Sequence, residues 1–369
     1  MERIAKRAAG DPLLLGVQVL LLTLGLAALF SASHFYAERV FHDPYYLVKR
    51  QLTFMLVGLA AFALSARTPL PLLRRATPVL LAVAFLLCLA TFVPGLGRSV
   101  LGARRWIFLF GQSFEPLELA KLAVVLYLAS ILAKKQERMD DPVNSLIPPL
   151  LVVLAFAGVI YLQKDFSTSV FLLVIALCMF LMAQVRLLYF VLLAVLFVPL
   201  GGLLLFTQAY RVQRLIAFFN PLVDPAGSGY QLIAARSALA GGGLWGRGLG
   251  RGLKSLGALP EAPSDFIFAV IGEEAGFLGV LFVVFLFLLL AWRGYTVAYR
   301  AQDAFTAFLA FGLTTTIFLQ ALLNFAVVSG LVPSTGIPLP FISAGGSCLV
   351  TSLAMSGLLL NLSRQPEAG

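Results

Sequence analysis

Long apolar runs recur along the whole chain and are separated by short polar segments. Each run approaches the roughly 20 residues that a helix needs to cross a hydrocarbon core of about 30 Å. The predicted spans are 12–32, 51–67, 77–94, 117–134, 145–163, 166–184, 187–208, 265–292, 303–328 and 344–362. This pattern predicts an all-α polytopic membrane protein of about ten transmembrane helices, in which residues 1–369 form one integral membrane domain.

The composition leads to the same class of protein. Of the 369 residues, 60% are hydrophobic and only 12% are charged, whereas roughly 25% are charged in soluble domains. An ordinary soluble globular protein is therefore excluded. The first apolar run is too long for a cleavable signal peptide. All three cysteines lie inside apolar runs, so no disulfide or metal cluster is predicted.

The basic residues predict an orientation and the class of partner. With the N-terminus inside, the inner segments carry more Lys and Arg than the short outer loops, which places both termini in the cytoplasm. The segment at about 209–264, between the seventh and eighth spans, then forms a long outer-face loop. The net charge of +10 favours anionic partners. Because the charges are scattered between spans, we expect lipid head groups and no nucleic acid.

Unusual polar residues collect in segments predicted to lie near the outer face. In "GARRWIFLFGQSFEPLELAK", 102–121, Pro116 is typical of a first helical turn. Glu118 and Lys121 then lie one turn apart on the same face. They form either an internal ion pair or the charged wall of a cavity, because ionisable groups within spans usually face a bundle interior or water. In the predicted hairpin "QKDFSTS", Asp165 is placed to cap the next helix.

The predicted outer loop contains two further segments of this kind. "YRVQRLIAFFNPLVDPAG" mixes Arg211 and Arg214 with large apolar residues, a pattern typical of a short helix on a membrane surface. "GGGLWGRGLGRGLKS", 241–255, combines glycines, whose N–H groups stay accessible, with Arg247 and other basic residues. This combination suits phosphate binding. The alternative is a flexible loop with solubilising charges.

The proline- and glycine-rich "GLVPSTGIPLPFISAGGS", 330–347, predicts a rigid non-helical segment between two spans. Such backbone is tolerated at membrane depth only where protein buries it or a cavity wets it. Gln320 and Asn324 precede this segment on the adjoining helix. Their amide side chains are typical of hydrogen bonds between helices.

Three acids stand at the start of the eighth span. Asp265 is either a helix cap or, with basic residues on neighbouring loops, a general base. The cations would then stabilise a phosphate-type leaving group. In a straight helix Glu273 and Glu274 lie about 12 Å further down. We expect them to pair with an inward Arg or Lys, and a proton path is the alternative.

The segment around these acids, "LPEAPSDFIFAVIGEE", resembles a signature of the SEDS family, the RodA, FtsW and SpoVE proteins of bacterial elongation, division and sporulation. "GARRWI", "EPLELAKL", "GYQLIAARSALAGGGLWGRGLG" and "GIPLPFISAGGS" are similar to further family segments, in the family's order and over nearly the whole chain. The chain resembles RodA more than FtsW. The resemblance implies a single SEDS domain with ten spans in the bacterial cytoplasmic membrane.

The resemblance also implies an activity and its residues. SEDS proteins are peptidoglycan glycosyltransferases that polymerise lipid II together with a class B penicillin-binding protein. A RodA-like chain would do so during cell elongation, in contact with membrane lipids. The family's essential aspartate falls on Asp265, and the aspartate of its hairpin falls on Asp165. Its motif residues beside the cavity fall on Arg105, Trp106, Glu118, Lys121 and Glu261.

The chain departs from the family pattern at a few positions. Pro263 and Ser264 stand where His-Thr is common, Ala344 replaces a Tyr, and Cys348 replaces a Ser. These changes weaken any role for the missing side chains. None of them removes a carboxylate or a cation on which the interpretation depends.

The hypothesis for the reaction is an inverting glycosyl transfer. The 4-hydroxyl of an acceptor's GlcNAc attacks C1 of the donor's MurNAc, Asp265 accepts the proton, and polyprenyl diphosphate leaves. The predicted substrate-binding residues are Arg105, Trp106, Glu118, Lys121, Arg211, Arg214, Arg247 and Glu261. The predicted structural or secondary residues are Asp165, Glu273, Glu274 and Asn324.

Two questions stay open at this point. No metal ligands are predicted, but a divalent cation such as Mg²⁺ could accompany the diphosphate. The alternative functions are a flippase or transporter of lipid-linked cell-wall precursors and a non-catalytic scaffold for a class B penicillin-binding protein. Against the flippase, the charged residues gather at the outer face, whereas transport sites usually lie near the bilayer midplane. The scaffold leaves the matching Asp265, Glu118 and Lys121 without a purpose.

Overall fold

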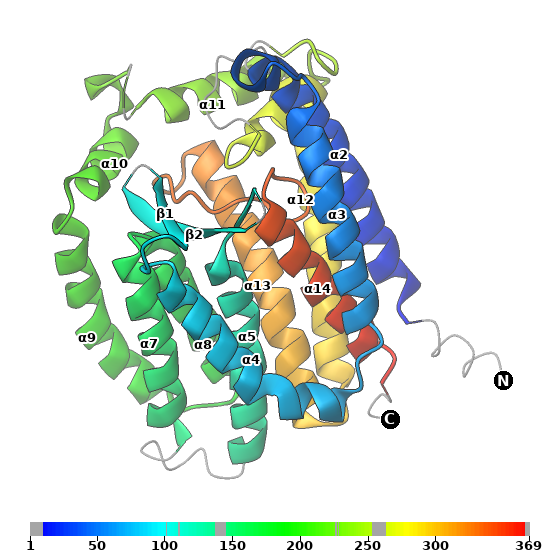
Figure 1. The fold of residues 1–369 in the computed structure, drawn as a ribbon, viewed down its shortest axis with the longest axis vertical. Coiled ribbons are helices and arrows are strands. Elements are labelled where there is room, and N and C mark those ends of the chain that lie inside the picture. The colour runs from blue at the N-terminus through cyan, green and yellow to red at the C-terminus, as the bar shows by residue number, and fades with distance from the viewer. Residues whose placement is uncertain are drawn as a thin grey trace.

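Ten apolar helices occupy the positions of the predicted spans in the part of the chain that the structure describes (Figure 1). The computed structural model describes residues 10–100, 102–109, 111–136, 145–225, 227, 229–252 and 263–365. The helices are α2 (Pro12–Phe41), α3 (Tyr46–Ser65), α4 (Leu70–Ala90), α5 (Pro116–Lys135), α7 (Ile147–Leu162), α8 (Phe166–Met182), α9 (Leu187–Phe206), α12 (Ile267–Arg300), α13 (Ala304–Ser329) and α14 (Gly346–Leu362).

Seven of these helices in the described part of the chain are long and apolar enough to cross a membrane. The other three, α7, α8 and α14, have 16 or 17 residues. The class of a helical membrane protein is thus confirmed, while a count of ten spans stays a prediction. The first helix is longer than predicted, because α2 continues to Phe41 instead of ending near residue 32.

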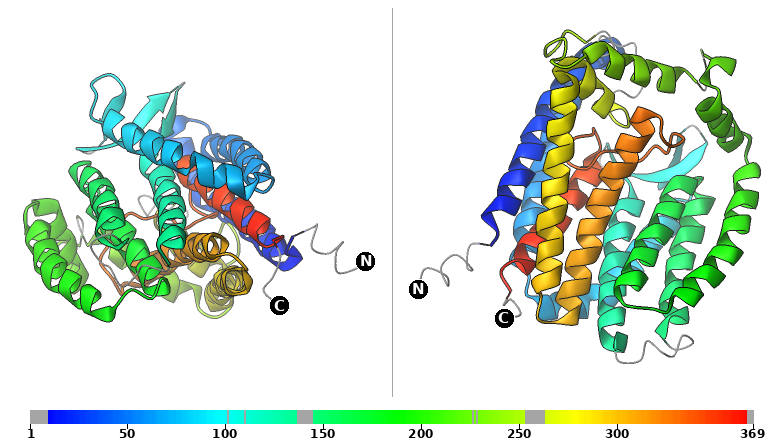
Figure 2. Two further views of the ribbon diagram at one scale, coloured as in Figure 1. Left: turned by 90° about the horizontal axis from the view of Figure 1, so that it is seen from below. Right: turned by 180° about the vertical axis from the view of Figure 1, so that it is seen from behind.

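The centre of the bundle is formed by α5 and α13, which pack against each other and are the most buried of the candidate spans. Around them α13 also contacts α8, α12 and α14. Helix α9 lies at the periphery and is drawn in green at the outer edge of both views in Figure 2. Apart from Phe190, which packs against the core, the described side chains of its span are not buried by the rest of the protein, which agrees with its apolar composition on every side.

A small antiparallel sheet, which the sequence analysis did not predict, precedes α5. It consists of β1 (Gly97–Val100), β2 (Ala103–Leu109) and β3 (Gln112–Phe114), in the order β1-β2-β3. Gly102 and Gly111 lie at the turns and have φ angles of 78° and 76°, a conformation that favours glycine. The sheet holds Arg105 and Trp106 beside the bundle.

Two helices follow α9 and cross the same end of the bundle, at the top of Figure 1. They are α10 (Ala209–Phe219) and α11 (Tyr230–Gly242), joined by the short turn η2 (Pro221–Val223). The amphipathic helix expected in "YRVQRLIAFF" is therefore present. Its Arg211 side chain is buried, whereas Phe219 is exposed.

Helix α12 is not straight, which corrects the prediction that Glu273 and Glu274 lie deeper in a continuous span. Gly276 has φ 68° and ψ −166°, a non-helical conformation inside the helix. A Cβ placed on Gly272 would lie 3.3 Å from Val280 Cγ2, although eight residues of straight helix span about 12 Å. The chain therefore reverses at Gly276, and the two acids lie at the corner.

The glycine-rich loop closes this corner. Its N–H groups donate to the carbonyl oxygens of Glu273 and Glu274, and its own carbonyl oxygens accept from the N–H groups of Phe277 and Leu278. Because the helix is interrupted at Gly276, these carbonyl and N–H groups of α12 have no partners within the helix. The loop thus provides hydrogen-bond partners for the α12 main chain on both sides of Gly276.

Candidate functional site

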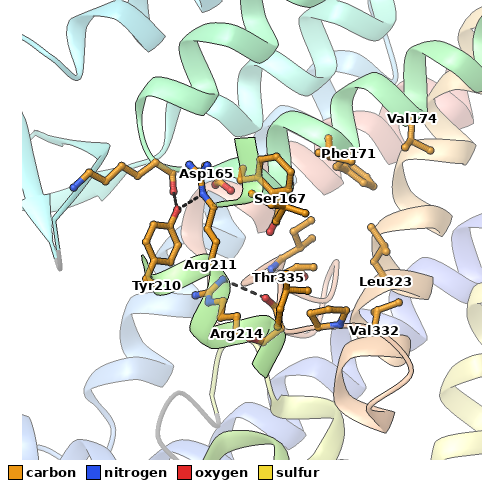
Figure 3. A pocket seen from close by; sticks show the side chains of 18 of the residues that line it. Asp165, Ser167, Phe171, Val174, Tyr210, Arg211, Arg214, Leu323, Val332 and Thr335 are labelled. Carbon is orange, nitrogen blue, oxygen red and sulfur yellow. Dashed lines mark hydrogen bonds between the residues drawn. The ribbon is translucent and has the colours of Figure 1, made fainter. Parts of the chain in front are cut away.

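A cavity of about 320 Å³ lies between α8, α10, α13 and the non-helical segment that follows α13 (Figure 3). Among the described residues that line it, four are basic and one is acidic: Arg105, Lys164, Arg211, Arg214 and Asp165. The opposite wall is apolar, with Phe171 and Val174 from α8 and Leu319 and Leu323 from α13. A cavity that is basic at one end and apolar at the other suits an anionic amphiphile.

Arg105 and Asp165 join the sheet to the start of α8. Arg105 Nη1 lies 3.2 Å from Asp165 Oδ2, and Arg105 Nη2 donates to the carbonyl oxygen of Lys164 at 2.6 Å. Asp165 is also the N-cap of α8, because its Oδ1 accepts from Thr168 N at 3.1 Å. Asp165 therefore caps a helix and orients a cavity arginine.

Arg211 is held rigidly on α10. Its Nη1 donates to Leu204 O at 2.7 Å and to the Tyr161 hydroxyl at 3.1 Å, and its Nε donates to the Tyr210 hydroxyl at 3.1 Å. The guanidinium also lies 4.6 Å from the centre of the Tyr161 ring, in the range of a cation–π contact. These partners are hydroxyl groups, a carbonyl group and aromatic rings, none of which cancels the positive charge.

Arg214 links α10 to the other side of the cavity. Its side chain is exposed, and Nη1 donates to Ser334 O at 3.2 Å, as the lower dashed line in Figure 3 marks. Thr335, in the same segment, also lines the cavity. Arg214 thus contributes a positive charge to the cavity, and its exposed side chain makes few contacts that stabilise the fold.

Asp265 lies next to the cavity wall and is not one of the residues that line it. Its half-buried carboxylate accepts from the Ser264 hydroxyl at 3.2 Å. A Cβ placed on Gly336 would lie 3.5 Å from Asp265 Oδ2, and both neighbours of Gly336 line the cavity. The segment around Gly336 therefore stands between the aspartate and the basic end.

Glu118 and Lys121 form an internal ion pair, which is one of the two arrangements that their spacing left open. Lys121 Nζ lies 2.9 Å from Glu118 Oε2 and donates to Gln320 Oε1 at 2.8 Å. Both charged side chains are buried. Neither lines the cavity, and Lys121 Nζ lies 5.7 Å from the ring of Phe171, which does. Direct contact with substrate stays a prediction for both.

Arg247 is engaged with the protein rather than presented for phosphate. Its Nη1 lies 3.5 Å from Glu273 Oε1, and its Nε donates to Gly241 O at 3.0 Å. Glu274 accepts from the Ser31 hydroxyl and from Gly250 N. The loop "GGGLWGRGLGRG" thus uses the main-chain N–H groups of Arg247, Gly248 and Gly250 to close the α12 corner. Its glycines therefore have a structural role that needs no phosphate.

The remaining predicted residues are placed as follows. Trp106 is half-buried in β2, opposite Arg98, and does not line the cavity. Asn324 Nδ2 donates to the main-chain oxygen of Asp265 at 2.9 Å. Glu261 lies outside the described residues. Sequence reasoning missed Tyr210, which could have been found from its position beside Arg211.

Glu115, just before α5, adds a titratable carboxyl group to this region. Burial raises the pKa of Glu115 to about 8, and the negative charges of Glu118 and Asp165 add to the effect. Arg105 and Lys121 act in the opposite direction. At neutral pH Glu115 is therefore mostly protonated.

This raised pKa predicts a pH-dependent stability. Between pH 4.5 and 8 the unfolded chain loses the Glu115 proton while the folded protein keeps it, so stability falls as pH rises. Glu115→Gln removes this dependence. We expect its thermal midpoint in detergent to match wild type near pH 5 and to exceed it by about 2 °C at pH 8. Equal midpoints at both pH values would contradict the assignment.

Among the described residues, the side chains at the cavity do not form a metal-binding group. The described part of the chain contains no group of three or more His, Cys, Asp or Glu side chains placed to hold a metal ion. The acid that lines the cavity, Asp165, is paired with Arg105. A divalent cation that arrives with a diphosphate stays a prediction.

Comparison with known proteins gives a consistent family. The family model described as cell cycle protein, FtsW/RodA/SpoVE, matches residues 12–368. A probable peptidoglycan glycosyltransferase FtsW of Geobacter sp. (strain M18) is 40% identical over 354 residues, which cover 96% of each chain. Stage V sporulation protein E of Bacillus subtilis (strain 168) is 37% identical over 361 residues, which cover 97% of this chain and 98% of that protein.

Solved structures share the fold. A chain from a peptidoglycan synthase complex that coordinates polymerization and crosslinking superposes with a TM-score of 0.79 at 27% identity, covering 96% of this chain and 98% of that one. The crystal structure of Thermus thermophilus rod shape determining protein RodA gives a TM-score of 0.70 at 27% identity, covering 96% and 97%. The closer resemblance to RodA is not confirmed, because the FtsW protein shares the higher identity. The chain belongs to the FtsW/RodA/SpoVE family of membrane proteins.

Proposed function

We propose that this protein is a peptidoglycan glycosyltransferase that polymerises lipid II at the outer face of the bacterial cytoplasmic membrane, with both termini in the cytoplasm. The observation that carries the proposal is the cavity, which is basic at one end, apolar at the other and adjacent to Asp265. Lipid II has the matching parts, a diphosphate and a polyprenyl chain. The glycosyltransferase names of the FtsW relatives support the same activity.

The geometry suits a transfer in which leaving group and base lie on different sides. Arg105, Arg211 and Arg214 bind the donor's diphosphate and stabilise the charge that grows on it as the C1–O bond breaks. The acceptor's 4-hydroxyl forms the new bond to C1 from the opposite face and gives its proton to Asp265. A single carboxylate is sufficient, because attack from the opposite face inverts α to β without a covalent intermediate.

The polyprenyl chain requires an apolar path. Phe171 and Val174 continue the cavity along α8, and Leu319 and Leu323 continue it along α13. An isoprenoid chain buries its surface against such side chains at roughly 25 cal/mol per Å². The diphosphate then stays at the basic end while the chain extends along the helices.

The partner and the cellular role belong to the same proposal. A class B penicillin-binding protein would crosslink the strands, in line with the synthase complex that this chain resembles. The resemblance to RodA predicts a role in elongation, whereas the higher identity to FtsW proteins favours division. Localisation of a fluorescent fusion to the side wall or to the septum decides between them.

The function is tested in liposomes that contain purified protein, lipid II and the cognate penicillin-binding protein with its transpeptidase blocked. We expect release of polyprenyl diphosphate together with glycan strands. Movement of lipid II between leaflets without diphosphate release would support the flippase. Absence of both, with partner binding intact, would support the scaffold.

One substitution tests the basic end of the cavity. We expect Arg214→Gln to lower kcat/KM for lipid II by about 3- to 10-fold through both a higher KM and a lower kcat, as for loss of one charge-assisted contact of about 1 kcal/mol that also stabilises the leaving diphosphate. Arg236→Gln is the matched control, because Arg236 is also exposed and donates to Gly330 O at 3.1 Å but does not line the cavity. Equal effects of the two changes would argue against an anion site at Arg214.

A further inference from the structure

Two amide side chains one turn apart on α13 make long-range hydrogen bonds in place of contacts within their own helix. Gln320 and Asn324 are buried, with 3% and 1% of their surface exposed. Their nitrogen atoms donate to main-chain carbonyl oxygens of the two non-helical segments that meet beside the cavity. The face of α13 that carries them therefore touches both segments.

Asn324 connects the segment of Asp265 to residues 337–344, which begin with the cavity-lining Ile337 and form what we call the cavity wall here. Its Nδ2 donates to Asp265 O at 2.9 Å and to Ile337 O at 3.0 Å. Its buried Oδ1 accepts no hydrogen bond from the described residues. The donor end of the amide therefore makes the connection, and an oxygen in its place could not make it.

Gln320 continues this connection one residue further along the wall. Its Nε2 donates to Pro338 O at 2.9 Å. A proline offers only its carbonyl oxygen to a hydrogen bond, so the wall at this point is held through that atom. Gln320 Oε1 accepts from Lys121 Nζ at 2.8 Å.

The buried ion pair explains why the Gln320 amide faces this way. Lys121 can only donate, and Glu118 holds it in place at 2.9 Å. The lysine therefore fixes the oxygen of Gln320 toward itself and turns the nitrogen toward Pro338. The ion pair acts on the wall through Gln320 without reaching the cavity.

The same two segments are also joined further along. The Ser343 hydroxyl donates to Ser264 O at 2.6 Å, and Ala344 N donates to Pro263 O at 2.8 Å. Residues 263–265 are thus fixed along their main chain to residues 337–344. The position of the Asp265 carboxylate depends on how this wall is seated on α13.

We propose that Gln320 and Asn324 are positioning residues, which seat the cavity wall and the Asp265 segment on α13 and take their orientation from the buried Glu118–Lys121 pair. The inference rests on the proposed function for its catalytic consequence. A reacting group displaced by about 1 Å loses roughly 10²-fold in rate. Loosening the wall should therefore lower kcat and leave substrate binding at the basic end largely intact.

The test uses Gln320→Glu and Asn324→Asp, which keep size and shape and replace each donating nitrogen by an oxygen. Gln320→Glu still offers an acceptor to Lys121, although its carboxylate adds a negative charge beside the Glu118–Lys121 pair. We expect each variant to lower kcat for lipid II by about 30-fold or more and to change KM by less than about 3-fold. Thr316→Val is the matched control, because Thr316 is buried on the same helix and donates only to Gly312 O within it. It should keep kcat within about twofold.

A second measurement reports on how the cavity wall is held and does not depend on enzyme activity. Hydrogen exchange is followed at residues 339–344, where Leu339 N donates to the Ser343 hydroxyl and Ala344 N donates to Pro263 O. We expect exchange to be about tenfold faster or more in both variants, and unchanged in Thr316→Val. This readout stays valid for a variant with reduced stability, because global unfolding would raise exchange along all helices together.

The outcomes separate this inference from the function on which it rests. Lower kcat with faster exchange confined to the wall supports the positioning role. Unchanged exchange, unchanged kcat, or an equal loss in Thr316→Val overturns it. If wild type makes no polymer, the proposed function fails, and the exchange measurement alone then decides whether the two amides seat the wall.

Discussion

Asp265→Asn is expected to lower kcat for glycan formation by about 10²- to 10⁴-fold, the usual contribution of a general base. The amide keeps the shape of the side chain and its contact with the Ser264 hydroxyl, but it cannot accept the acceptor's proton. Since the basic end of the cavity is unchanged, binding of lipid II should stay within about 3-fold. Polymer assays and lipid II binding are measured on the same purified sample.

The control for this change is Asp43→Asn. Asp43 lies in the turn between α2 and α3, where it pairs with Lys49 at 2.8 Å, and both side chains reach solvent. Such exposed pairs contribute at most about 1 kcal/mol, so activity should be unaffected. Near-normal polymerisation by Asp265→Asn would assign the base to another residue.

Gly276→Ala is expected to prevent accumulation of folded protein, the largest effect on stability among the changes considered. A Cβ on Gly276 would overlap Gly246 N and lie 2.6 Å from Leu244 O. The positive φ of 68° also disfavours any residue with a side chain. Backbone cannot move aside as a flexible side chain could, so we expect a loss of several kcal/mol. The yield of monodisperse protein and its thermal midpoint report this loss.

Gly201→Ala is the matched control on α9. A Cβ there meets nothing within 4 Å, and alanine in a helix is favoured over glycine by roughly 1 kcal/mol. Gly201→Ala should therefore fold at least as well as wild type. A Gly276→Ala protein with a normal midpoint would contradict the reversed geometry of α12.

The helices were predictable because their signals are local. Apolar runs mark all ten helices in the described part of the chain, Pro116 begins α5, and Asp165 caps α8 through Thr168 N. The amphipathic pattern around Arg211 likewise predicted α10. In each case neighbouring residues suffice to define the element, so the sequence carries the information.

The arrangement of the site was less predictable because it depends on contacts between distant segments. The reversal at Gly276 requires the loop at 243–248 to supply hydrogen bonds, and no local pattern shows that pairing. The same loop contains Arg247, whose basic character suggested phosphate until its contact with Glu273 was seen. Glu118 and Lys121 could be placed on one face from their spacing, but that spacing could not show that Gln320 covers them.

The most direct test of the account is glycan polymerisation from lipid II by the purified protein with its cognate penicillin-binding protein, whose transpeptidase is blocked. Wild type and Asp265→Asn are compared on one gel at equal amounts of folded complex. We predict long glycan strands from wild type and at least about 10²-fold less polymer from Asp265→Asn. Strands of equal length and amount from both proteins would contradict it.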